Sequence, residues 1–174
     1  MNNIKFKYVT FLLLFVLFIV GSCEKDSKNE QEIKGDVYFY LLKSYKTRDN
    51  SSEIIVRTAQ IADKPLIDYK DIISYNSDLS VYNISKKARE KILGLITEVS
   101  GPAFAVTIDE KIIYAGYFWP ATSSVSCDWT SIDPLFVDFW DGLKVMPGNN
   151  WDKPNPGNDS SLIEIFKRDK KLVN

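Results

Sequence analysis

Four tryptophans lie close together in the C-terminal half of the chain, and they are the residues best suited to bind a ligand. They are Trp119, Trp129, Trp140 and Trp151, and four further aromatic residues accompany them: Tyr117, Phe118, Phe136 and Phe139. Flat rings on loops can stack on sugars or dock protein partners, and nearby acids can bind hydroxyl groups. The candidate ligand-binding residues are therefore Tyr117, Trp119, Asp128, Trp129 and Trp151.

Packing in the core is the alternative role for these rings, because large aromatic side chains are usually mostly buried. Trp140 follows Phe136 and Phe139 in an apolar segment, which favours the core for this residue. Trp119 and Trp151 stand beside proline or loop residues, so burial and ligand binding are equally compatible with their positions.

The chain contains no histidine. Ser-His-Asp and Cys-His catalysis, histidine zinc sites and the usual pH switch are therefore excluded. Cys127, in the segment 123–129, could serve as a nucleophile or a redox-sensitive thiol, but no lysine or arginine is close in sequence to activate it. A small buried hydrophobic residue is the simpler role for this cysteine.

Carboxylates provide the remaining route to catalysis, at Asp128, Asp133, Asp138 and Asp141. A glycosidase needs two carboxylates roughly 5 to 10 Å apart across a cleft, and spacing in the sequence does not establish such a pair. Asp152, Asn155, Asn158 and Asp159 could together bind calcium, but they lack the EF-hand spacing and are interrupted by prolines. We predict no catalytic residue, no metal and no cofactor.

The N-terminus has the pattern of an export signal. Lys5 and Lys7 precede thirteen almost wholly apolar residues, 8–20, and the chain then reads Val20-Gly21-Ser22-Cys23. This arrangement is typical of a secretory signal, and a cysteine directly after small residues resembles the lipobox of bacterial lipoproteins. The resemblance implies that Cys23 is acylated and becomes the first mature residue.

Two alternatives to a lipoprotein stay open. An uncleaved membrane anchor is one, although thirteen helical residues would span only roughly 20 Å of a hydrocarbon core roughly 30 Å thick. A secretory signal that releases a soluble product is the other. Acidic residues soon after Cys23 resemble the signals that send some Gram-negative lipoproteins to the outer leaflet. We expect an outer-membrane, surface-exposed location, with a periplasm-facing anchor or an ordinary linker as the alternatives.

The chain divides into a signal peptide at 1–22, a lipidated cysteine and charged tether at 23–34, and one globular domain at 35–174. Loss of Lys5 and Lys7 with the signal would change the net charge from -1 to -3. No run of basic residues could follow a phosphate backbone, so nucleic acid is not an expected partner. The expected partners are a lipid bilayer, through Cys23, and a glycan or an envelope protein. Cys127 would be the only thiol left, so no intramolecular disulfide is expected.

The first part of the domain predicts strands and one clear helix. Residues 36–45 and 53–60 favour two strands joined by a hairpin, 68–75 a short helical turn, and 79–84 a third strand. Ser85 then has the character of an N-cap for a helix over 86–99. Its apolar residues share one face: Ala88, Ile92, Leu95, Ile96 and Val99.

The second part predicts a hairpin and a closing helix. Residues 103–108 and 111–118 flank the polar pair Asp109-Glu110. The strand, helix and hairpin order of 79–118 resembles the periplasmic head subdomain of the accessory subunit of the bacterial protein-export translocase, which implies an α+β arrangement. A strand is expected at 143–146. Ser161 and Glu164 match a capping box, which favours a helix over 162–171 with Leu162, Ile165 and Phe166 inward. The alternation of this segment also permits a strand.

Together these patterns predict a single α+β domain, a mainly antiparallel sheet with the helix 86–99 packed on it. The favoured function is a membrane-anchored envelope lipoprotein that acts as a binding or interaction module. A carboxylate-dependent enzyme acting on carbohydrate is the first alternative. A structural component of an envelope assembly is the second, and it would present an apolar surface patch.

Overall fold

The computed structural model describes residues 34–95, 101–148 and 154–174. The predicted signal peptide, Cys23, most of the predicted tether and Trp151 therefore lie outside the described residues. Within the described ranges, neither helix has the length and apolar character needed to cross a membrane.

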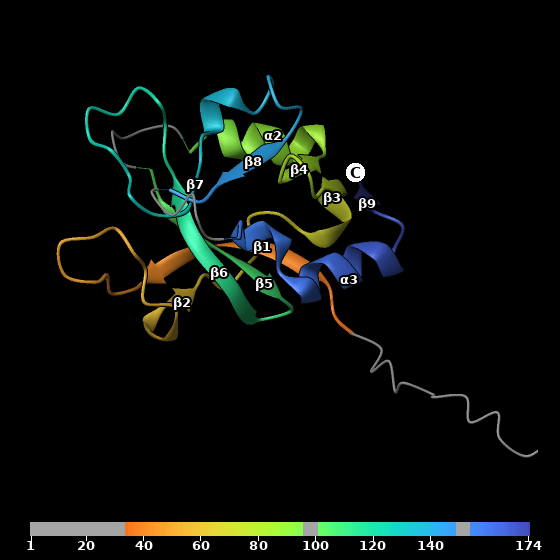
Figure 1. Cartoon of the computed structure of the whole chain (residues 1–174), viewed down its shortest axis with the longest axis horizontal. Helices are drawn as coiled ribbons and strands as arrows, with labels where there is room; N and C mark the ends of the chain where they lie inside the picture. The colour runs from red at the N-terminus through yellow and green to blue at the C-terminus, as the bar shows by residue number, and fades with distance from the viewer. Residues whose placement is uncertain (1–33, 96–100, 149–153) are drawn as a thin grey trace, which may run out of the picture. The chain divides into compact units, whose positions relative to one another are not determined.

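The described residues form a nine-stranded, mostly antiparallel sheet in the order β2-β1-β5-β6-β7-β8-β4-β3-β9 (Figure 1). Among the strand pairs of these described residues, β6–β7 and β3–β9 are parallel and the others antiparallel. The strands are β1 Val37–Ser44, β2 Gln60–Ile61, β3 Ile72–Asn76, β4 Val81–Ile84, β5 Ala103–Ile108, β6 Lys111–Phe118, β7 Ser131–Ile132, β8 Leu143–Met146 and β9 Leu172–Val173. With the helices α2 Lys86–Leu93 and α3 Ser160–Arg168, this architecture confirms the predicted α+β class.

The β5–β6 hairpin forms where the sequence predicts it. Ile108 pairs with Lys111 across a turn made by Asp109 and Glu110. Asp109 has a φ of 51°, the left-handed conformation that tight hairpin turns require and that Asp tolerates better than most residues. The missing glycine is thus replaced by a residue that can adopt the same backbone geometry.

Helix α2 begins as predicted and ends earlier. The Ser85 hydroxyl accepts a hydrogen bond from the Ala88 amide at 3.2 Å, which confirms the N-cap. The helix stops at Leu93 with Gly94 as its C-cap, so the predicted extension fails at this point, where glycine costs about 1 kcal/mol relative to alanine. Residues 96–99 of the predicted helix lie outside the described residues.

Two predicted segments differ from the structure. The expected strand over 53–60 is wrong: Ile54 makes a single bridge to Thr47, Val56–Thr58 forms a 3-10 turn, and only β2 follows. The Thr58 side chain stabilises the 3-10 turn, because it accepts a hydrogen bond from the Lys46 amide and donates one to the Ile55 carbonyl. The helical turn expected over 68–75 is confined to Tyr69–Asp71, and β3 follows directly.

The closing helix α3 starts at Ser160 and ends at Arg168, so both ends lie earlier than in the predicted range 162–171. Asp159, rather than the Ser161–Glu164 capping box, caps it, with its side chain accepting from the Ser161 amide at 2.9 Å. The inward residues are those predicted: Leu162, Ile165 and Phe166 are fully buried. The positive N-terminal end of the helix dipole also stabilises the negative charge of an aspartate at this position.

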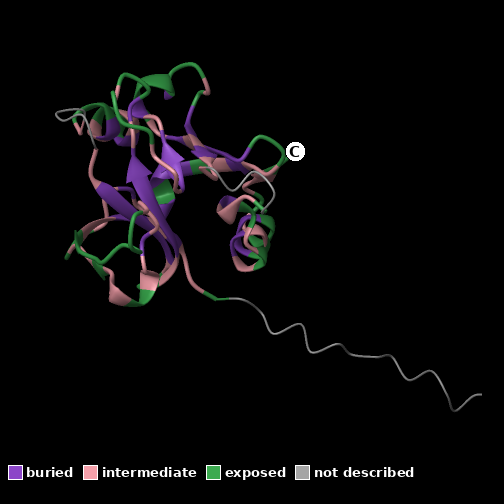
Figure 2. Ribbon diagram, turned by 60° about the vertical axis from the view of Figure 1, so that its left-hand side comes forward, coloured by how far each residue is buried: buried purple, intermediate pink, exposed green. Residues whose placement is uncertain are grey.

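The main core contains several fully buried rings, including Phe39, Tyr75, Tyr82 and Phe166. In Figure 2 the buried residues run along the strands, while exposed residues gather on the loops. The buried hydroxyls are hydrogen-bonded: Tyr114 donates to Tyr82 at 3.2 Å, and Tyr75 donates to the side chain of Asn158 at 2.6 Å. Burial raises the pKa of Tyr75 to about 12.

Candidate ligand-binding pocket

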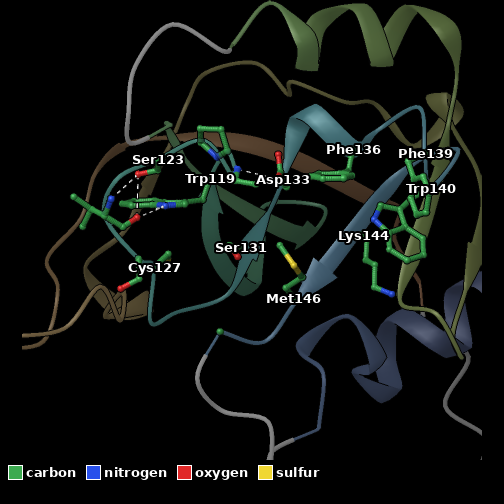
Figure 3. A pocket seen from close by; sticks show the side chains of 15 residues that line it. Trp119, Ser123, Cys127, Ser131, Asp133, Phe136, Phe139, Trp140, Lys144 and Met146 are labelled. Carbon is green, nitrogen blue, oxygen red and sulfur yellow. Dashed lines mark hydrogen bonds between the residues drawn. The ribbon is translucent and has the colours of Figure 1, made fainter.

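A pocket of about 510 Å³ opens beside β7 and β8, and its walls carry four aromatic rings (Figure 3). The rings belong to Trp119, Phe136, Phe139 and Trp140. Ligand sites commonly enclose roughly 300 to 1,000 Å³ and have mostly apolar walls with a few polar groups. The pocket therefore has the size and wall chemistry of a site for a small molecule or part of a larger one.

The loop that follows β6 holds Trp119 in place. Its indole N–H donates to the Val125 carbonyl at 3.0 Å, and the Ser123 hydroxyl donates to the same oxygen, also at 3.0 Å. The Trp119 ring also packs edge-on against Tyr117, with ring centroids 6.0 Å apart. One end of the pocket is thus pre-formed by hydrogen bonds within a single loop.

The aromatic turn, residues 134–141, supplies the other rings. Asp133 caps its start: one carboxylate oxygen accepts from the Leu135 amide at 2.9 Å, and the other accepts from the Ala121 amide at 2.8 Å. This carboxylate therefore joins the Trp119 loop to the aromatic turn. Phe136 is 44% exposed and Phe139 72% exposed at the pocket.

Helix α2 fixes the position of the aromatic turn. Arg89 donates to Asp138 at 2.8 Å and to Asp141 at 2.7 Å, and only 21% of its side chain is exposed. These hydrogen bonds, that to Asp138 first, raise the pKa of Arg89. At the end of the turn, the Gly142 amide donates to the Val137 carbonyl at 2.9 Å. The turn is exposed but held at both ends.

Lys144, on β8, places a cation at the Trp140 end of the pocket (Figure 3). Its Nζ lies 3.8 Å from the centroid of the Trp140 ring. Within the described ranges, no carboxylate forms an ion pair with Lys144. A positive charge over an aromatic face is an attractive arrangement that also leaves the ammonium group able to meet a ligand.

Cys127 lines the pocket but is not activated. Its thiol donates a weak hydrogen bond to the Trp129 carbonyl at 3.5 Å. Burial raises the pKa of this thiol above its ordinary value. Because the thiolate is the reactive form, this environment opposes a nucleophilic role.

Of the five candidate ligand-binding residues, the structure places Trp119 in the pocket wall and three of the others elsewhere. The Trp129 indole donates to the Ala115 carbonyl at 3.0 Å, in a second apolar cluster that also contains the buried Tyr117. Asp128 accepts from the Ser52 amide and the Ser51 hydroxyl, both at 2.8 Å. Hydrogen bonding, first from the Ser52 backbone, lowers the pKa of Asp128. These three residues contact other parts of the protein and do not line the pocket.

Sequence reasoning missed most of the pocket wall. The sequence favours the core for Trp140 and does not include Phe136 or Phe139 among the candidate ligand-binding residues, yet all three line the pocket, and Trp140 is half-buried. The available signal is the neighbouring acids: Asp138 and Asp141 flank the rings, and charged residues are rarely buried without partners. Lys144 and Met146 are partly exposed on β8 and alternate with the buried Leu143 and Val145. No feature of the sequence indicates that they line a pocket.

The other chemical hypotheses find little support in this pocket. Among its described lining residues Asp133 is the sole carboxylate, and Asp138 and Asp141 are paired with Arg89. Of the possible calcium ligands, Asn155, Asn158 and Asp159 each use a side-chain oxygen to accept a hydrogen bond within the protein, and Asp152 lies outside the described residues. The described ranges contain no cluster of three His, Cys, Asp or Glu residues placed to hold a metal.

The described residues thus form an aromatic pocket with a fixed Trp119 end and a cationic Trp140 end. This arrangement can bind a ligand by ring contacts and charge. It does not assemble a nucleophile, a general base or a carboxylate pair within the described lining. Comparison with known proteins gives no significant match, whether to protein-family models, to curated proteins or to solved structures.

Proposed function

We propose that this protein is a membrane-anchored envelope lipoprotein whose globular domain binds a ligand in the aromatic pocket. The observation that carries the proposal is the set of four rings around one opening of about 510 Å³. Two of these rings, Phe136 and Phe139, stay substantially exposed although a folded domain gains stability by burying them. Exposed rings held around a pocket are typical of binding surfaces.

The anchor part of the proposal rests on the sequence Val20-Gly21-Ser22-Cys23 after an apolar segment. Acylation of Cys23 would attach the domain to a bilayer, and we propose the outer membrane, with the domain at the cell surface. In a detergent phase-partition assay we expect the native protein in the detergent phase and Cys23→Ser to accumulate as an unlipidated precursor. Identical migration and partitioning of the two proteins would contradict the anchor.

A glycan and an envelope protein are the two ligand classes that the aromatic residues first suggest. Sugar rings can stack on Trp119 or Trp140. A neutral glycan also needs free polar groups, and Asp133, Ser123 and Cys127 already hydrogen-bond within the protein. The exposed side chains of Leu135, Phe136 and Phe139 on the aromatic turn favour contact with a protein as the second candidate.

The binding test uses isothermal titration calorimetry of the full chain in lipid nanodiscs, with empty nanodiscs as the blank. The titrants are 2-naphthamide, a neutral ring compound, and a panel of polysaccharide fragments. We expect saturable binding of at least one titrant, weakened about fivefold or more by Phe139→Ala or Trp140→Ala, the scale of an aromatic contact.

Ile73→Ala is the matched control, because Ile73 is 61% exposed on β3 and is not part of the pocket lining. This variant should bind like the native protein. Absence of saturable binding to every titrant, or an equal loss in Ile73→Ala, would contradict a binding function for this pocket.

A further inference from the structure

The walls of the pocket select for an apolar ring more than for a polar chain. Trp119, Phe136 and Trp140 present ring surfaces, and Met146 adds a flexible apolar side chain between them. Figure 3 shows these four residues among the side chains that line the pocket. Flat rings pack against aromatic walls in offset or edge-on arrangements and bury much area with little loss of freedom.

The charges around the pocket are arranged asymmetrically. Asp133 lies near the Trp119 side of the pocket, where two backbone amides already hydrogen-bond to its carboxylate. Asp138 and Asp141 are paired with Arg89 at 2.8 and 2.7 Å. Lys144 lies at the opposite end, over Trp140.

Lys144 differs in its contacts from Lys43, Arg48 and Lys171. Lys43 pairs with Asp63, and Arg48 pairs with Glu53. Lys171 also lies over a ring, 3.9 Å from the Tyr69 centroid, but it donates to the Tyr69 and Ile72 carbonyls, whereas Lys144 has no such acceptor among the described residues. Among the described residues, the interaction that holds the Lys144 ammonium group is a cation–π contact with the Trp140 ring. A ring surface attracts the ammonium group but accepts no full hydrogen bond from it, so its donors stay available.

We propose that the ligand is an apolar ring compound that carries an acid group, with the ring between the aromatic walls and the acid group at Lys144. The inference rests on the proposed binding function and names the ligand class for the same pocket. The ring would face Trp119, Phe136 and Trp140, and the negative charge would point away from Asp133. Charge thereby sets the orientation of the ligand, while the rings supply contact area.

The test compares 2-naphthoate with 2-naphthamide, two probes of nearly the same shape that differ in charge. Both are titrated calorimetrically into the full chain in lipid nanodiscs. We expect the native protein to bind the acid about fivefold more tightly than the amide, the scale of one partly exposed ion pair. Raising the salt concentration should reduce this preference.

Lys144→Gln should abolish the preference and leave binding of 2-naphthamide within about twofold of native. Lys144→Arg keeps the positive charge and should keep the preference. Lys111→Gln, which removes an exposed lysine at the start of β6 away from the pocket lining, is the charge control and should behave like the native protein. Thermal melting of each variant confirms that the fold is retained.

The outcomes separate this inference from the proposed function. Equal binding of the two probes by the native protein, or an undiminished preference in Lys144→Gln, would overturn the inference and leave a neutral-ligand pocket standing. Tighter binding of decanoate than of 2-naphthoate would also overturn it, because the ligand would then be a flexible chain. Failure of both naphthalene probes and of every glycan fragment would overturn the proposed function together with the inference.

Discussion

Two pairs of aromatic rings in this domain meet edge to face with nearly the same geometry. The Phe39 and Tyr82 centroids are 5.1 Å apart at 90°, and the Phe139 and Trp140 centroids are 4.9 Å apart at 88°. Phe39 and Tyr82 are completely buried, whereas Phe139 is 72% exposed. The geometry of the contact between two rings therefore does not distinguish a core pair from a surface pair. The structure that surrounds and covers the rings makes this distinction.

The backbone around each pair explains the difference. Phe39 and Tyr82 lie on strands β1 and β4, and Phe166 from α3 packs against Tyr82 at 5.8 Å between centroids. Phe139 and Trp140 lie on a turn that Asp133 caps and Arg89 holds. The first pair is covered by a helix, while the second forms part of a pocket wall.

The largest effect expected from this comparison is on stability. Phe39→Ala should reduce the free energy of unfolding by about 3 to 5 kcal/mol, because it leaves a cavity in the main core. The matched change Phe139→Ala should alter it by less than about 0.5 kcal/mol, since the ring is already largely in water. Urea denaturation measures both, and similar losses in the two variants would erase the distinction between the pairs.

A change at Gly142 should have an intermediate effect, because this residue joins the exposed turn to the core. A Cβ added there would lie 2.2 Å from the backbone oxygen of Tyr82, so the β4 backbone or the turn would have to move. We expect Gly142→Ala to cost about 2 kcal/mol, in the range of other overpacking changes, and to weaken probe binding as well. Native binding in a destabilised Gly142→Ala protein would show that the pocket does not depend on this contact.

The smallest expected effect is on stability at acid pH, and it comes from Asp169, which accepts a hydrogen bond from Tyr69 of the main core. Hydrogen bonds from Arg168 and, more weakly, Tyr69 lower the pKa of Asp169 to about 2. Because the folded pKa is below the unfolded value of about 3.9, this carboxylate stabilises the fold above roughly pH 4, and the contribution is lost as the pH falls toward 2.

Asp169 is 28% exposed, so solvent screening limits its contribution to about 1 kcal/mol. Asp169→Asn should lower stability at pH 7 by this amount and flatten the acid limb of a pH–stability curve. A curve of unchanged shape between pH 4 and pH 2 would show that another group controls this limb.

The elements that follow from local pattern were predictable. The β5–β6 hairpin, the Ser85 cap and the inward face of α3 each rest on residues that are near one another in the chain. β2 and β7 are two residues long and show no periodicity, so their existence depends on neighbouring strands.

The pocket was predictable only in part, for a similar reason. Trp119 was a candidate because a proline and a loop follow it, and the structure places it in the wall. Phe139 and Trp140 resemble core residues in sequence, and their exposure depends on Arg89, which is 49 residues from Asp138. Whether a ring is covered is set by such distant contacts, and a linear pattern does not contain them.

Residues 160–173 complete the core and the sheet of the domain, so the chain cannot finish folding without them. α3 inserts Leu162, Ile165 and Phe166 into the main core, and β9 then pairs with β3 nearly 100 residues earlier, joining Tyr75 to Leu172. Such long-range pairing carries a high contact order and slows folding toward milliseconds to seconds. A growing chain cannot close this core until residue 173 has emerged from the ribosome, so its apolar core residues stay accessible to chaperones until then.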